Sequence, residues 1–159
     1  MAARASAVAR ALGNRSLLAD ASDARMRDRL NDIKLREHYR PIAPVCRLED
    51  AGRVFDTDFE DPYMLYFRMV TSNRLAAVTH VDGSARCQTV TPKTNKPLHD
   101  LLSAVAARSG IGVLCNTSLN YPGAGFINKM SHLAAYCADR GVSDFVVGDA
   151  WYQHLPEQA

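Results

Sequence analysis

The sequence predicts an α/β (α+β) layered fold in which helices pack on a twisted mixed sheet. Strand-like and helix-like segments alternate along the chain, which favours a layered mixture of the two. The chain has 159 residues, the size of one ordinary domain, and 47% of them are hydrophobic. No internal repeat, low-complexity tract or Gly/Ser linker divides it. We therefore expect a single domain.

The first third of the chain predicts two short helices separated by extended chain. Residues 23–32 place apolar side chains at helical spacing behind several candidate N-caps. Pro41 and Pro44 exclude helix and favour an extended segment. Residues 48–55 predict another helical turn, and residues 56–62 a loop.

The middle of the chain predicts strands. Residues 63–70 are aromatic and apolar, which is typical of a strand. Residues 76–91 predict a long strand or a hairpin broken at Asp82-Gly83, because this dipeptide is a strong turn signal.

The last third alternates helix and strand. Residues 98–109 form an amphipathic helical pattern that Gly110 ends. Residues 112–117 predict a buried strand, residues 131–140 a last helix, and residues 144–152 a closing strand.

The charge and hydropathy patterns argue against nucleic acid and membrane as partners. The formal net charge is +2, and aromatic residues do not interleave with basic ones. No run of about 18 apolar residues predicts a membrane helix. Residues 1–16 resemble an organellar transit peptide in composition, but residues 10–20 belong to a domain motif described below. We expect neither class of partner.

The four cysteines predict buried free thiols. They are Cys46, Cys87, Cys115 and Cys137. None forms a C-x-x-C pair, and the spacing fits neither a zinc site nor a disulfide scaffold. Free thiols are typical of a reducing cytosol, so we expect a cytoplasmic protein with no metal held by cysteine.

A first polar segment carries Lys34 and Arg36, with Arg40 close behind. In an extended segment Lys34 and Arg36 point to the same face, because side chains alternate with period two. Guanidinium forks beside an ammonium group suit a phosphate site. The alternative is a solvated strand face.

A second polar segment places His80, Asp82, Ser84, Arg86 and Gln88 on one parity. The intervening residues are small or apolar, which predicts that the other face packs on a core. Side chains that donate hydrogen bonds, accept hydrogen bonds and carry charge on one face indicate a binding surface. An ordinary exposed strand face is the alternative.

A third polar segment follows the buried strand at residues 112–117. Asn116, Ser118 and Asn120 alternate with other residues at its carboxyl end, where ligands collect in open α/β sheets. A polar turn is the alternative. Taken together, the three segments predict an anion pocket, and no Walker-type loop, G-x-G-x-x-G, G-x-S-x-G or H-E-x-x-H motif is present.

Six ordered motifs carry a family resemblance. They are RALGNRSLLAD (10–20), LNDIKLREHYRPIAP (30–44), DPYM (61–64), AVTHVDGSARCQTV (77–90), LCNTSLN (114–120) and DFVVGD (144–149). In this order and spacing they resemble the NodU/CmcH-type carbamoyltransferases, which carbamoylate hydroxyl groups of secondary metabolites. One departure is Leu119, which stands where the family usually has Phe.

The resemblance implies a two-domain enzyme with an actin-like N-terminal domain and a C-terminal domain of YrdC-like fold. The C-terminal domain is expected to bind carbamoyl phosphate and ATP, with Mg²⁺ accompanying the ATP, and to form carbamoyl-adenylate. The N-terminal domain is expected to transfer the carbamoyl group to the acceptor alcohol. The fold-level kinship with RNA-modifying proteins suggests nucleic-acid binding as well, but the near-neutral charge disfavours it.

The resemblance also implies roles for individual residues. The K-x-R, the later arginine and the S-x-N of the family correspond here to Lys34, Arg36, Arg86, Ser118 and Asn120. The three cations are expected to neutralise the phosphates, which otherwise repel each other. His80 is expected to orient the carbamoyl group or a water, and Asp82 is the carboxylate most open to assisting Mg²⁺. Arg40 and Asn116 complete the expected binding set.

The motifs of the family's first domain are missing from this chain. We therefore expect residues 1–22 to be a remnant of the domain junction and residues 23–159 to be the C-terminal domain. Arg10 and Arg15 lie at the domain junction in the family, so we expect their side chains to lack the partners that the first domain supplies. We therefore expect either a standalone domain that makes carbamoyl-adenylate, or one that partners a separately encoded N-terminal domain. The alternative is a truncated, catalytically inactive binding module.

Overall fold

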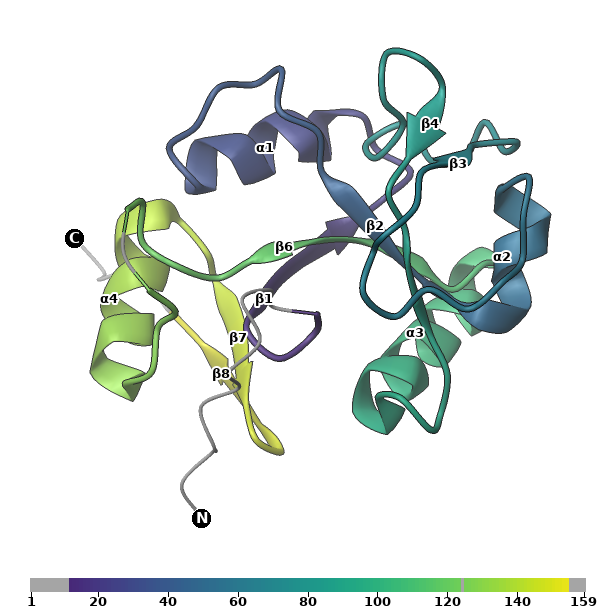
Figure 1. Ribbon diagram of the computed structural model, residues 1–159. Helices are drawn as coiled ribbons and strands as arrows, with labels where there is room; N and C mark the ends of the chain where they lie inside the picture. Colours follow the sequence, from purple (N-terminus) through teal and green to yellow (C-terminus); the bar gives the residue numbers. More distant parts are fainter. Residues whose placement is uncertain (1–11, 124, 155–159) are drawn as a thin grey trace.

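The computed structural model describes residues 12–123 and 125–154, with a four-stranded sheet at the centre (Figure 1). Its strands are β1 (Ser16–Asp20), β2 (Ala43–Arg47), β5 (Gln88–Val90) and β6 (Val113–Ser118), in the order β1-β6-β2-β5. Strand β6 is antiparallel to both of its neighbours, whereas β2 and β5 are parallel. The sheet is therefore mixed, as predicted.

One face of the sheet is covered by helix α3 (Lys96–Ser109). Leu98 and Leu102 of this helix pack against Val45 and Val90 in a small, fully buried cluster. The predicted stop signal is confirmed, because the glycine after the helix has a left-handed φ of 85°.

A larger core lies on the opposite face. Helices α1 (Arg25–Ile33), α2 (Leu48–Val54) and α4 (Met130–Arg140) all contribute buried side chains to it. Cys115 of β6 belongs to this core, whereas the preceding Leu114 packs against the α3 cluster. Successive strand residues face opposite sides, so β6 supplies both cores. The α/β (α+β) class and all four predicted helices are confirmed.

The four cysteines are buried and free, as predicted. Within residues 12–123 and 125–154, no helix combines the length and the apolar character needed to cross a membrane.

The segment before α1 is part of the sheet. Strand β1 pairs with β6 along its whole length, although these residues were expected to belong to a domain junction. The expectation that Arg15 lacks a partner is wrong, because its Nε donates a hydrogen bond to the carbonyl of Ile127 at 3.0 Å. Arg10 lies outside the described residues.

The predicted strand at residues 63–70 is wrong apart from β3 (Arg68–Met69), which pairs with β4 (Ser84–Ala85). Both carboxylate oxygens of the buried Asp61 accept backbone N–H groups from Leu65 and Tyr66. Those N–H groups are therefore not available to a strand partner. The buried Arg68 holds the other side of the loop by donating to two backbone carbonyls.

The predicted strand at residues 76–91 is also broken. The N–H groups of Val78 and Thr79 both donate to the carbonyl of Leu75, which makes a turn, and only β4 and β5 are extended. The predicted Asp82-Gly83 turn is confirmed, because Gly83 has a φ of 81°. This conformation suits glycine, which carries no Cβ.

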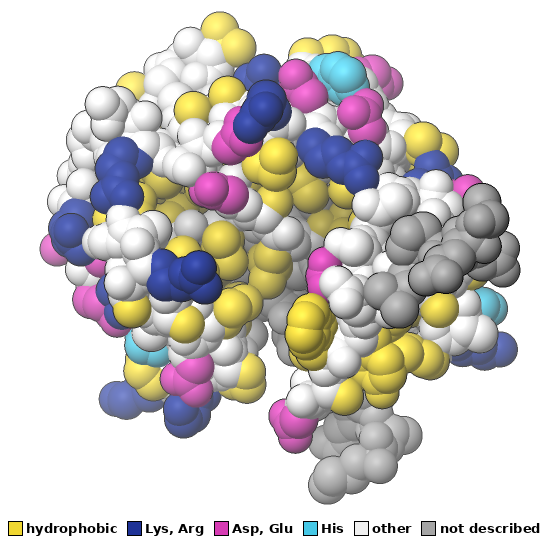
Figure 2. Space-filling model, turned by 180° about the vertical axis from the view of Figure 1, so that it is seen from behind, with side chains coloured by type: hydrophobic (Ala, Val, Ile, Leu, Met, Phe, Trp, Pro, Cys, Tyr) yellow, Lys and Arg dark blue, Asp and Glu magenta, His cyan; other side chains and the backbone are white. Residues whose placement is uncertain are grey.

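The closing strand is a hairpin of two strands, β7 (Asp144–Val147) and β8 (Ala150–Gln153), so a single strand was wrong. Val146 and Trp151 lie opposite each other and are 67% and 68% exposed. The face in Figure 2 is hollowed between the side that carries α3 and the side that carries this hairpin, and hydrophobic side chains line the hollow.

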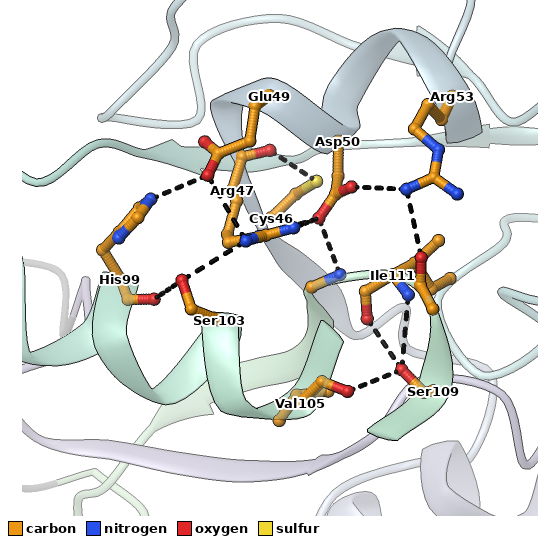
Figure 3. Close-up of polar contacts among 12 residues, drawn as sticks. Cys46, Arg47, Glu49, Asp50, Arg53, His99, Ser103, Val105, Ser109 and Ile111 are labelled. Carbon is orange, nitrogen blue, oxygen red and sulfur yellow. Dashed lines mark hydrogen bonds and ion pairs between the residues drawn. The ribbon is translucent and has the colours of Figure 1, made fainter. Parts of the chain in front are cut away.

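The buried carboxylate of Asp50 joins several of these elements (Figure 3). It is 2% exposed and accepts hydrogen bonds from Arg47 Nε at 2.8 Å, Arg53 Nη1 at 2.9 Å and the backbone N of Gly112 at 2.8 Å. Arg47 also donates to Ser103 on α3. Burial opposes ionisation, but the hydrogen bonds from Arg47 and Gly112 outweigh it and lower the pKa of Asp50. Helix α2 is thereby tied to β2, to the residue before β6 and to α3.

We predict that Asp50→Asn lowers the free energy of unfolding by about 2–4 kcal/mol, because it removes the buried anion that the Arg47 and Arg53 guanidinium groups share. Urea unfolding followed by circular dichroism measures this difference. Asp100→Asn is the matched control, since that carboxylate is 57% exposed and pairs with the exposed Lys96. It should change the free energy by no more than about 0.5 kcal/mol. Equal effects of the two substitutions would contradict the role of Asp50.

Candidate functional site

One end of the central sheet gathers polar and positively charged residues from distant parts of the chain. The carboxyl end of β6 lies beside the amino end of β2, because Asn116 is opposite Ala43 in this antiparallel pair. Strand β5 is parallel to β2, with Gln88 opposite Val45, so its amino end lies at the same end of the sheet. The segments that lead into β2 and β5 therefore approach the residues that follow β6.

Lys34 joins the end of α1 to the end of β6. The extended segment expected around it is wrong, because Lys34 caps the helix and Leu35 follows with a φ of 49°. The Nζ of Lys34 donates to the carbonyl of Ser118 at 2.5 Å, to its Oγ at 3.1 Å and to Asn120 Oδ1. Ser118 Oγ also donates to Asn120 Oδ1 at 2.7 Å. Two of the predicted segments thus meet through this ammonium group.

The environment of Lys34 is unusual for a charged group. The residue is only 9% exposed, and its three hydrogen bonds go to a carbonyl, a hydroxyl and an amide oxygen rather than to a carboxylate. Burial, and then the nearby charge of Arg36, lowers the pKa of Lys34 to about 8. A bound anion would supply the missing counter-charge and favour the protonated form.

Arg36 is oriented by Asn31, which lies on α1 and is 0% exposed. Arg36 Nε donates to Asn31 Oδ1 at 2.5 Å. The amide nitrogen of Asn31 donates to the carbonyls of His38 at 3.2 Å and Arg40 at 3.0 Å. Asn31 therefore positions a cation and also holds the loop that leads to β2.

Arg36 borders an open hollow of about 590 Å³ that is also lined by Asp32, Leu35 and Glu37. Burial, and then the charge of Arg40, lowers the pKa of Arg36, while Glu37 opposes the shift. Arg40 itself pairs with Glu37 at 2.8 Å, and its side chain is 52% exposed. Arg40 therefore contributes charge at the rim of the hollow, and the structure does not bring its side chain to Lys34.

Asn116 lies two residues before Ser118 and on the same face of β6. Its Nδ2 donates to Gln88 Oε1 at 2.9 Å, and Gln88 Nε2 donates to the carbonyl of Leu12 at 3.3 Å. Among the residues that the structure describes, nothing bonds to the buried Oδ1 of Asn116. Asn116 thus links β6 to β5 across β2.

His80, Asp82 and Ser84 come together for a reason other than strand parity. The shared strand face predicted for residues 80–88 is wrong, because the chain turns at Gly83. The turn places His80 Nδ1 3.1 Å from Ser84 Oγ, which donates to Asp82 Oδ1 at 2.7 Å. Burial lowers the pKa of His80, Asp82 opposes the shift, and Arg86 adds to it.

Arg86 is a half-buried cation between β4 and β5. It forms no hydrogen bond or ion pair with any residue of the described ranges, 12–123 and 125–154. Its positive charge contributes to the lowered pKa of His80. A guanidinium group with five donors and no carboxylate partner suits an anionic ligand.

The site therefore has two parts. Lys34, Ser118 and Asn120 are in direct contact. Arg86 precedes β5 at the same end of the sheet, and His80 lies in the turn that leads into β4. No hydrogen bond joins the two parts within the described portion of the chain. Separate cationic groups around one sheet end suit a ligand that carries more than one phosphate.

Sequence reasoning missed Asn31. The signal was an amide residue next to the core residue Leu30 within a helical pattern. A buried amide in such a position needs hydrogen-bond partners, which here are the Arg36 side chain and the loop carbonyls.

Comparison with known proteins gives one family match and several close relatives. The model of the family described as "Carbamoyltransferase C-terminus" matches residues 1–154. The chain is 68% identical over 145 residues to a 3'-hydroxymethylcephem-O-carbamoyltransferase of Amycolatopsis lactamdurans, covering 91% of this chain and 28% of that protein. It is 64% identical over 147 residues to a protein of the same name from Streptomyces clavuligerus, covering 92% and 28%.

A more distant relative is Nodulation protein U of Sinorhizobium fredii, which is 45% identical over 120 residues, or 74% of this chain and 22% of that protein. The chain thus spans less than a third of the length of the relatives that it matches.

We predict that the affinity of the protein for sulfate falls as the pH rises through about 8, because the Lys34 ammonium is charged below its pKa and neutral above it. Sulfate is the probe because it stays dianionic throughout this range. Titration calorimetry at several pH values measures the affinity, and the bound anion should shift the transition upward.

Lys34→Met should weaken binding about tenfold at low pH and remove the pH step. Lys93→Met is the matched control, because Lys93 is exposed, and it should keep both the affinity and the step. A wild-type affinity that does not change with pH would contradict the role given to Lys34.

Proposed function

Because this chain belongs to the carbamoyltransferase C-terminus family, we propose that it binds carbamoyl phosphate and ATP and forms carbamoyl-adenylate for an O-carbamoyltransferase. The observation that carries the proposal is the Lys34 ammonium, which is held at the end of β6 with neutral acceptors and no carboxylate. Such a charge is stabilised most by an anionic ligand. The YrdC-like fold that the resemblance implies is part of this proposal, and the mixed sheet with helices on both faces is compatible with it.

The cations would act on charge repulsion between the two substrates. Carbamoyl phosphate and ATP are both anions, and Lys34, Arg36 and Arg86 would offset their charges. In phosphoryl and nucleotidyl chemistry, positioning and charge stabilisation supply most of the rate enhancement. Ser118 and Asn120 would keep the Lys34 ammonium in place, and Asn116 would hold the neighbouring strand.

The reaction can be written with its atoms balanced. Water releases phosphate from carbamoyl phosphate and leaves carbamate. A carbamate oxygen then bonds to the α-phosphorus of ATP, and pyrophosphate leaves. The remainder of the enzyme, on the same chain as in the longer relatives or on a separately encoded one, would transfer the carbamoyl group to an alcohol.

Mg²⁺ would accompany ATP and offset phosphate charge. Among the residues that the structure describes, no three His, Cys, Asp or Glu side chains form a group suited to hold a metal ion. The donor set therefore suits a metal held mainly by the nucleotide phosphates. Asp82, which was expected to assist the metal, uses its Oδ1 for the backbone N and the hydroxyl of Ser84.

The acceptor class that we propose is a hydroxymethyl group of a cephem. The chain is 68% and 64% identical to two relatives named for that acceptor, against 45% to Nodulation protein U. The buried free thiols agree with a cytoplasmic site for this chemistry.

A second candidate function is a nucleotide- and carbamoyl-phosphate-binding module without turnover. The two candidates differ in chemistry and not in ligand.

We predict that the protein catalyses exchange of labelled pyrophosphate into ATP only when carbamoyl phosphate is present, because adenylate formation is reversible. Lys34→Met should reduce the exchange at least about a hundredfold, since a removed phosphate-binding charge acts on binding and on the transition state. Lys93→Met should leave the exchange unchanged.

Binding of carbamoyl phosphate without exchange, seen as a rise in Tm, would support the module instead. Absence of both binding and exchange would overturn the proposed function.

A further inference from the structure

The turn between β3 and β5 contains a chain of hydrogen bonds that ends on an imidazole ring. The backbone N of His80 donates to the carbonyl of Ser84 at 2.7 Å, and the backbone N of Gly83 donates to the carbonyl of His80 at 3.0 Å, which closes the turn. Inside it, Ser84 Oγ lies 2.7 Å from Asp82 Oδ1 and 3.1 Å from His80 Nδ1. Ser84 is 4% exposed, so its hydroxyl depends on these two partners.

The direction of both hydrogen bonds follows from the number of protons. The hydrogen bonds from Ser84 lower the pKa of Asp82, so its carboxylate is ionised at neutral pH and only accepts. The single hydroxyl proton of Ser84 must therefore go to Asp82. Ser84 Oγ can then only accept from His80, which requires a proton on Nδ1.

We infer that Asp82 and Ser84 hold neutral His80 in the Nδ1–H tautomer, so that its Nε2 lone pair is the hydrogen-bond acceptor offered to the carbamoyl NH₂ group of the substrate. Within residues 12–123 and 125–154, no side chain or backbone group bonds to this Nε2. The ring is held on another side by Phe67, in an edge contact with centroids 5.8 Å apart. Ser84 and Asp82 are thus positioning residues that act through His80.

The identity of the ligand group rests on the proposed function. Arg86, two residues after Ser84 in the chain, makes this region suitable for a phosphate, and the one hydrogen-bond donor group of carbamoyl phosphate is its NH₂. Acetyl phosphate has nearly the same shape and phosphate but has a methyl group in that position. When acetyl phosphate binds, the Nε2 of His80 finds a methyl group where carbamoyl phosphate has its NH₂ donor. The unmet acceptor lowers the affinity for acetyl phosphate. His80 therefore determines specificity for the carbamoyl group.

The tautomer can be measured without substrate. Nitrogen-15 NMR of the histidine side chains at about pH 8.5, where imidazole is neutral, should show His80 with a protonated Nδ1. His99 is an internal reference for the other tautomer, with the proton on Nε2, because its Nε2 faces the carboxylate oxygen Oε1 of Glu49 at 2.9 Å. A His80 signal with a protonated Nε2 in the wild-type protein would overturn the inference.

Two substitutions test the hydrogen-bond chain from Asp82 through Ser84 to His80 without disturbing the fold. Asp82→Ala frees the Ser84 hydroxyl to donate to Nδ1, so His80 should shift to the Nε2–H form; Asp82 is exposed, so the fold should survive. Ser84→Ala should leave a mixture of tautomers. Asp100→Ala is the exposed control and should leave the wild-type tautomer.

A second experiment tests specificity by comparing the affinities of the protein for carbamoyl phosphate and acetyl phosphate. The wild type should prefer carbamoyl phosphate at least about tenfold, and Asp82→Ala should bring the two affinities close together. Equal wild-type affinities would overturn the role in recognition. Absence of binding by either ligand would overturn the proposed function, while the tautomer would still be decided by NMR.

Discussion

Strand β6 is the constraint on which both the fold and the site depend. It is the only one of the four sheet strands that is antiparallel to both of its neighbours, and its alternate residues enter the two cores on opposite faces. Where its pairing ends, the carbonyl of Ser118 and the side chain of Asn120 receive the Lys34 ammonium. A displacement of β6 would therefore disturb the packing of the sheet and the position of this charge together.

Several positively charged side chains at one end of the sheet are stabilised only in part. Lys34 is bonded to neutral oxygens, Arg36 is bonded to the amide of Asn31, and Arg86 has no bonding partner in the described portion of the chain. By contrast, Arg47 and Arg53, which serve the fold, share the carboxylate of Asp50. Paired charges hold elements together, whereas unpaired charges at one sheet end favour an anionic ligand.

Buried polar side chains explain why several segments with strand-like composition do not form strands. Asp61 takes the backbone N–H groups of Leu65 and Tyr66, and Arg68 takes nearby carbonyls. The segment 63–67 is therefore held as an ordered loop with its aromatic side chains exposed. Asp82 and Ser84 do the same for the turn at Gly83, where local hydrogen bonds replace those of a ladder.

The sequence by itself determined the helices, the mixed sheet and the free thiols, because helical periodicity, capping glycines and cysteine spacing are local signals. It also predicted Lys34, Ser118 and Asn120 as candidate site residues, through their polarity and a family resemblance. Only the tertiary structure decided how they meet: Lys34 reaches Ser118 from the end of a helix, 84 positions earlier in the chain. Strand parity misplaced Lys34, Arg36 and the residues around His80, because parity holds only where the chain is extended. The roles of Asn31 and Ser84 depend on partners that no local pattern specifies, since a buried polar group is satisfied by whichever residues the fold brings to it.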